Sequence, residues 1–126
     1  MMQNHNRPVY LNLFRIQLPV TGMVSIIHRV TGVIWVLLLP VLAYVLHRSL
    51  SSESGFQWVV SLWSERSIRL LTLISVLTLM QHFFSGIRHL LLDLDMGVSL
   101  PVARTTAWFC FVLTAILALW LGVCWW

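Results

Sequence analysis

A histidine in an apolar setting is the residue of this sequence best suited to chemistry. His82 follows an apolar run long enough to make up most of a membrane span. An ionisable side chain there is costly unless another group pairs with it or coordinates it. Gly86 follows one helical turn later, so bare backbone lies next to the imidazole on the same face. This arrangement suits a flat ligand such as haem. The structural alternative is a hydrogen bond from His82 to a neighbouring helix, with Gly86 as a close helix contact.

A second polar cluster opens the first apolar run of the chain. Ser25 and Arg29 lie one turn apart on one helical face, and His28 and Gly32 form the adjacent pair. A guanidinium holds carboxylates with several donors in fixed geometry. A hydroxyl and a guanidinium together also supply hydrogen-bond donors to an oxygen acceptor. The alternative is that these polar groups only face lipid headgroups at a helix entrance.

The composition requires lipid around most of the chain. Of 126 residues, 59% are hydrophobic and 10% are charged. A soluble domain of this size cannot bury so much apolar surface. All eight basic residues are arginine, they are scattered, and the net charge is only +4, so we expect no nucleic-acid partner. Seven tryptophans are well suited to the two membrane interfaces.

Three apolar runs are long enough to position these clusters as membrane-spanning helices, at residues 25–46, 68–92 and 105–126. The sequence therefore predicts an all-α membrane protein with a single membrane-anchor domain, residues 1–126. Residues 1–24 are expected to form a surface segment, in which 10–16 alternate loosely as a strand or an interfacial stretch. No basic stretch leads directly into an apolar core there, so we expect no cleaved signal peptide. Residues 56–67 are too short to span and suit an amphipathic stretch at the interface.

This topology predicts that the two polar clusters meet at one membrane face, because the first helix enters where the second leaves. His89 lies seven residues, or about two turns, beyond His82 on nearly the same face, so His82 is about 10 Å deeper in the membrane. With a cytoplasmic N-terminus, five arginines lie inside and three outside, which agrees with the positive-inside rule. Inside would be Arg7, Arg15, Arg29, Arg88 and Arg104, and outside Arg48, Arg66 and Arg69.

The two motifs in this order resemble a known family. Ser25-x-x-His28-Arg29-x-x-Gly32, followed on the second span by His82-x-x-x-Gly86-x-Arg88-His89-x-x-x-Asp93, is similar to the cytochrome b556 subunits of succinate dehydrogenase, respiratory complex II. The resemblance covers nearly the whole chain and includes the three spans, with no departure at the motif positions.

The resemblance implies roles for individual residues. His82 is implied to be an axial ligand of haem b and so to bind its iron, and the second axial histidine comes from another small anchor subunit. Ser25 and Arg29 are implied to line the ubiquinone site, and His28 with Arg29 to approach the haem propionates. Supporting roles near the same face are implied for the remaining motif residues, Arg88, His89 and Asp93.

The resemblance also implies partners and a location. Succinate oxidation would take place in a flavoprotein subunit and an iron–sulfur subunit, since this chain has no dinucleotide fingerprint and no cysteine cluster. The expected location is the bacterial cell inner membrane. Three alternatives stay open: the anchor of a menaquinol-dependent fumarate reductase, a small transporter or channel subunit, and a structural anchor without haem. The absence of charges from the third span disfavours a transport path, which needs polar groups through the membrane depth.

Overall fold

The computed structural model describes residues 17–125, and the regular elements in that part of the chain are all α-helices. They are α1 (Val20–Ser51), α2 (Glu53–Leu62), α3 (Arg66–Asp93) and α4 (Leu100–Trp125). Three of them, α1, α3 and α4, are long and apolar enough to cross a membrane. The expected all-α membrane fold is therefore confirmed. The predicted alternating stretch at 10–16 lies outside the described residues.

The long helices exceed the thickness of the bilayer core. Their lengths are 32, 28 and 26 residues. At 1.5 Å per residue these helices extend about 48, 42 and 39 Å, against a hydrocarbon core of about 30 Å. Their ends therefore reach the headgroup region or the helices tilt. The short α2, 10 residues long, cannot span; it overlaps the predicted interfacial stretch at 56–67 but begins three residues earlier, at Glu53, and ends at Leu62.

Helices α1 and α3 begin earlier and end later than the predicted spans, and α4 begins earlier. Helix α1 begins at Val20 rather than Ser25, because the carbonyl of Pro19 accepts the amides of Gly22 and Met23 at 2.9 and 3.1 Å. It ends at Ser51, beyond the predicted boundary at residue 46. Hydropathy marks where a helix leaves the hydrocarbon, whereas the backbone hydrogen bonds continue into the interface. For the same reason α3 covers 66–93, and α4 begins at residue 100, five residues before its predicted start.

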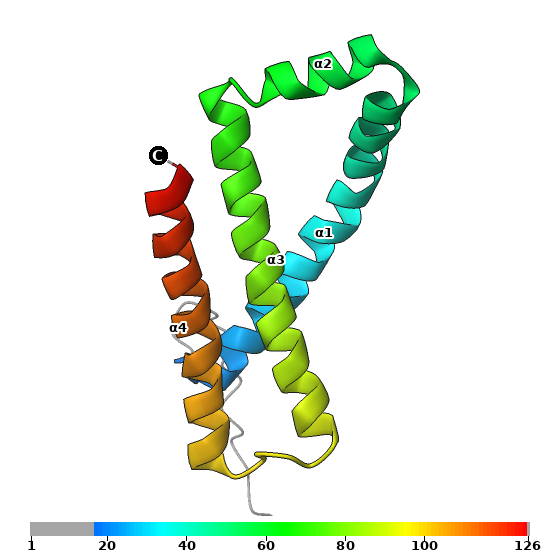
Figure 1. Ribbon diagram of the computed structural model, residues 1–126. Helices are drawn as coiled ribbons and strands as arrows, with labels where there is room; N and C mark the ends of the chain where they lie inside the picture. The colour runs from blue at the N-terminus through cyan, green and yellow to red at the C-terminus, as the bar shows by residue number, and fades with distance from the viewer. Residues whose placement is uncertain (1–16, 126) are drawn as a thin grey trace, which may run out of the picture.

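The helices cross near one end of the molecule and separate toward the other. Figure 1 shows the N-terminal half of α1 crossing α3, after which the two helices diverge toward α2, which joins them. Helix α4 runs beside α3 in the opposite direction, and α1 contacts both. The crossing of α1 and α3 brings together histidines from both polar clusters of the sequence.

The chain has almost no apolar core of its own. In the three spans only 6, 11 and 17% of the most apolar stretch is buried within the chain. Buried polar side chains are as prominent as buried apolar ones among the described residues: Thr31, Gln81, Ser85 and Arg88 against Val24, Ala107, Cys110 and Leu121. Lipid and other chains must therefore cover the outer faces, while polar contacts hold the helices to one another.

Candidate functional site: a histidine stack between α1 and α3

Three histidine rings stack at the crossing of α1 and α3. The ring of His28 on α1 lies between those of His82 and His89 on α3. The centroid distances are 4.1 Å to His82 and 4.9 Å to His89, with interplanar angles of 13° and 20°. The predicted common face of His82 and His89, and its meeting with the start of the first span, are therefore confirmed.

Hydrogen bonds to α1 fix the imidazole of His82. Its Nδ1 lies 3.0 Å from the carbonyl oxygen of His28, which only accepts, so Nδ1 carries the proton and donates. The hydroxyl of Thr31 lies 3.2 Å from the same nitrogen. That hydroxyl donates to carbonyls of its own helix, so toward His82 it is an acceptor. In the neutral tautomer that has Nδ1–H, the other nitrogen, Nε2, carries the lone pair that can bind a ligand.

Each helix accommodates the histidine of the other against a glycine. A Cβ at Gly32 on α1 would lie 3.0 Å from Cε1 of His82. A Cβ at Gly86 on α3 would lie 3.2 Å from Nε2 of His28. Both helices thus carry His-x-x-x-Gly, and the two motifs pack reciprocally. The expectation that a flat ligand lies over Gly86 is therefore wrong in this structure, because His28 takes that space. This contact and the hydrogen bond from His82 to α1 are the two features of the structural alternative raised by the sequence.

The remaining members of the first cluster lie at the edge of this stack. Ser25 is half-buried one turn before His28, on the side toward the α3–α4 loop. Arg29 follows His28 and is exposed. Neither side chain makes a hydrogen bond or ion pair with another residue between 17 and 125. Both are therefore free to bind a molecule or chain beside α1.

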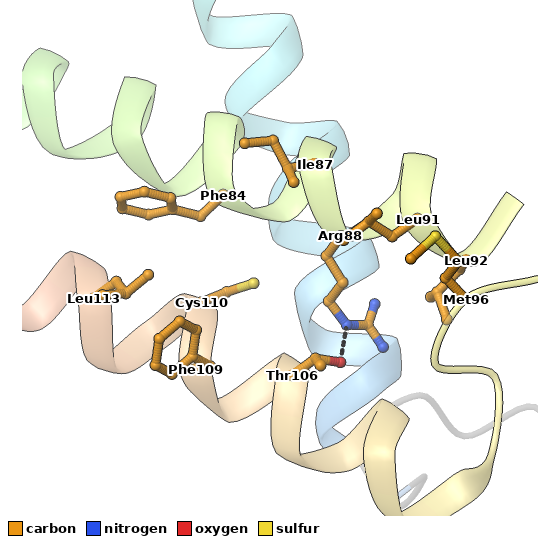
Figure 2. Close-up of a pocket in the computed structure, with 10 residues that line it drawn as sticks. All are labelled: Phe84, Ile87, Arg88, Leu91, Leu92, Met96, Thr106, Phe109, Cys110 and Leu113. Carbon is orange, nitrogen blue, oxygen red and sulfur yellow. Dashed lines mark hydrogen bonds between the residues drawn. The ribbon is translucent and has the colours of Figure 1, made fainter. Parts of the chain in front are cut away.

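The supporting residues of the second motif divide between two faces of α3. His89 joins the stack and donates from Nδ1 to the carbonyl of Ser85. Arg88 points the other way, toward α4, where its Nε donates to the hydroxyl of Thr106 at 3.2 Å (Figure 2). Its Nη2 donates to the carbonyl of Ala103 at 3.1 Å. Asp93 is exposed at the end of α3. Only His89 of these three contacts the histidine stack.

A buried polar chain also links α3 to α4. The hydroxyl of Thr114 donates to Oε1 of Gln81 at 2.8 Å, and Nε2 of Gln81 donates to the hydroxyl of Ser85 at 3.0 Å. Satisfied polar contacts of this kind hold membrane helices together where apolar packing gives no preference over lipid. The histidines of α3 instead face α1.

Two site residues, Thr31 and Gly32, have roles that the sequence did not reveal. Thr31 is 4% exposed and reaches the nitrogen of His82 from the neighbouring helix. Gly32 was recognised only as the partner of His28 within its own helix. The usable signal was the repetition of His-x-x-x-Gly on two antiparallel helices.

The histidines are better suited to axial ligation of a haem than to binding a bare metal ion. Residues 17–125 contain no group of three or more His, Cys, Asp or Glu side chains that could hold a metal ion. A haem needs only one imidazole from each of two chains for two axial bonds. The engaged Nδ1 and available Nε2 of His82 meet that requirement, so the residues present fit a haem.

Fold and site define a class: a multi-pass helical membrane protein with an imidazole cluster near one end of its bundle. Residues 3–121 match the family described as the succinate dehydrogenase/fumarate reductase transmembrane subunit. The chain is also 35% identical over 124 residues to the succinate dehydrogenase cytochrome b556 subunit of Coxiella burnetii. That alignment covers 98% of this chain and 99% of the relative. The chain belongs to the succinate dehydrogenase/fumarate reductase transmembrane-subunit family, as the motifs predicted.

Proposed function

We propose that this chain is the membrane-anchoring cytochrome b subunit of a succinate:ubiquinone oxidoreductase. In this function it binds haem b together with a second small anchor subunit and forms part of the ubiquinone-reduction site. Its other partners are the iron–sulfur and flavoprotein subunits, and its location is the bacterial inner membrane. The family match and the cytochrome name of the Coxiella relative support this proposal.

The observation that carries the proposal is the fixed imidazole of His82. Its Nδ1–H donates to His28 O, and this bond sets the tautomer in which Nε2 can bind iron. The haem would supply one-electron oxidation and reduction. His28 and Arg29 are the groups of this chain assigned to the haem propionates, since Arg29 is exposed and has no other partner among residues 17–125.

The quinone role rests on Ser25 and Arg29. A quinone carbonyl that accepts electrons develops negative charge on its oxygen, and a guanidinium stabilises that charge. The hydroxyl of Ser25 supplies a second donor one turn away. The supporting residues are His89, which holds His28 from the far side of the stack, and Arg88 and Asp93 near the same end of α3.

The first test is a reduced-minus-oxidised optical spectrum of the purified complex, wild type against His82→Ala. Loss or a marked shift of the b-type band is expected, because the variant lacks the axial imidazole. His47→Ala is the matched control, since His47 is exposed at the opposite end of α1. An unchanged band in His82→Ala would assign the ligand to another histidine. No band in the wild type would leave the structural-anchor alternative.

A second measurement separates the two oxidoreductase functions of the family. Quinones extracted from the complex should contain ubiquinone, and the complex should reduce ubiquinone with electrons from succinate. Rapid menaquinol oxidation without ubiquinone activity would identify a fumarate reductase anchor instead.

A further inference from the structure

A groove between α3 and α4 lies on the opposite side of α3 from the histidine stack. Its volume is about 320 Å³, at the lower end of small-molecule sites, which span about 300–1,000 Å³. Figure 2 shows its wall of apolar side chains, among them Phe84, Phe109 and Leu113. Arg88 and Thr106 are its polar members. The groove can therefore hold a largely apolar molecule with one polar end.

The charge of Arg88 has no counter-ion within the described chain. The side chain is 6% exposed, and its two hydrogen bonds go to a neutral hydroxyl and a neutral carbonyl. No acidic side chain of residues 17–125 forms an ion pair with it. A guanidinium that is both buried and unneutralised is costly in an apolar environment, so this position favours an anion.

The depth of Arg88 matches that of a lipid headgroup. It precedes the end of α3 at Asp93 by five residues, which is about 7.5 Å along the helix axis. That distance places Arg88 near the boundary between headgroups and acyl chains. The apolar wall continues from there toward the bilayer centre along Phe84, Phe109 and Leu113.

We propose that this groove binds an anionic phospholipid from the leaflet on the side of the α3–α4 loop. Its phosphate interacts with the Arg88 guanidinium, which is suited to phosphate by geometry as well as charge. One acyl chain lies along the apolar wall between α3 and α4, where burial of its methylene groups adds affinity. The lipid bridges the two helices beside the Gln81–Thr114 contact. This assigns Arg88 a lipid-binding function in addition to the supporting role proposed above.

The test is lipid binding by the purified complex after delipidation. Complex is reconstituted with phosphatidylglycerol or with phosphatidylcholine of the same chains, and bound lipid is counted by native mass spectrometry. We expect the wild type to retain phosphatidylglycerol at least about tenfold more strongly, a preference of about 1.4 kcal/mol. Arg88→Gln should abolish the preference, and Arg88→Lys should retain part of it because the charge remains. Arg104→Gln is the matched control, since Arg104 is exposed near the same end and outside the groove.

A second variant keeps the proposal testable if Arg88→Gln fails to assemble. Phe109→Glu places a negative charge on the apolar wall at a side chain that is 60% exposed, and it leaves Arg88 in place. It should reduce phosphatidylglycerol retention. Equal retention of the two lipids by the wild type would overturn the proposal, as would an unchanged preference in both variants. Displacement of phosphatidylglycerol by millimolar inorganic phosphate would assign the site to a free anion instead.

Discussion

At the scale of single residues, the site depends on which atom of each histidine is already engaged. His82 uses Nδ1 toward α1, and His89 uses Nδ1 toward its own helix. His28 carries no such bond to a described residue and is held by the rings on both sides. In His82, a hydrogen bond between helices fixes which ring nitrogen remains available to a ligand. A change at His82 should therefore affect the haem more than a change at His89.

Arg29→Leu should lower quinone reduction by about a hundredfold, the usual cost of losing one electrostatic stabiliser of a developing oxyanion. Succinate oxidation with an artificial electron acceptor should stay near the wild-type rate, because that acceptor bypasses the quinone. Both rates are measured on the same membranes. Arg104→Leu removes the same charge from an exposed position and should leave both rates unchanged.

An equal fall of the two activities in Arg29→Leu would show that Arg29 serves assembly rather than the quinone. Ser25→Ala should give the same selective pattern with a smaller effect, since a neutral donor contributes less than a charged one.

At the scale of helices, the reciprocal packing of two His-x-x-x-Gly motifs determines how α1 crosses α3. Each glycine allows an imidazole to lie against backbone, and each imidazole fills the space that the other helix leaves. The crossing therefore depends on glycine at both positions and on the flat shape of the rings.

Gly32→Ala should disturb the haem without unfolding the helix. Alanine is the better helix former by about 1 kcal/mol. The added Cβ, however, would lie 3.0 Å from Cε1 of His82, and overpacking of this kind costs about 1–3 kcal/mol. The ring must move, so we expect lower haem content and shifted low-spin EPR signals. Gly122→Ala is the control, because a Cβ there meets nothing within 4 Å. Identical EPR spectra for wild type and Gly32→Ala would contradict the proposed contact.

The helices themselves were predictable, whereas their rotation about their axes was not. Apolar length identified all three spans, and the common face of His82 and His89 followed from helical periodicity. The direction of Arg88 toward α4 did not follow, because the sequence places Arg88 next to His89 and does not say which neighbour each face meets. The contact of His28 with Gly86 could not be predicted for the same reason. Helix ends were missed because Pro19 and the polar residues after 46 extend α1 beyond its apolar part.

At the scale of the whole molecule, the described helices need lipid or other chains to cover their apolar outer faces. Helix α1 diverges from α3 toward α2, and its outer side chains are exposed, for example Val36 and Leu37 at 67 and 69%. The histidine stack, the residues proposed to bind quinone and the groove near Arg88 all lie toward the end where α3 joins α4. The proposed chemistry therefore takes place at one membrane face.

The orientation of that face can be tested with reporter fusions to this chain. The described arginines divide equally, with Arg29, Arg88 and Arg104 toward the site end and Arg48, Arg66 and Arg69 toward the other. The two arginines that precede α1 in the sequence make the predicted count five against three, and the positive-inside rule then places the site end in the cytoplasm. Three spans place the C-terminus on the other side. Alkaline phosphatase fused after Trp126 should therefore be active, and a fluorescent protein fused there should be dark. Fusions at Gly97, in the loop between α3 and α4, should give the reverse result. A fluorescent fusion after Trp126 would invert the topology and place the proposed site on the outer face, where soluble subunits docking from the cytoplasm could not deliver electrons to the quinone.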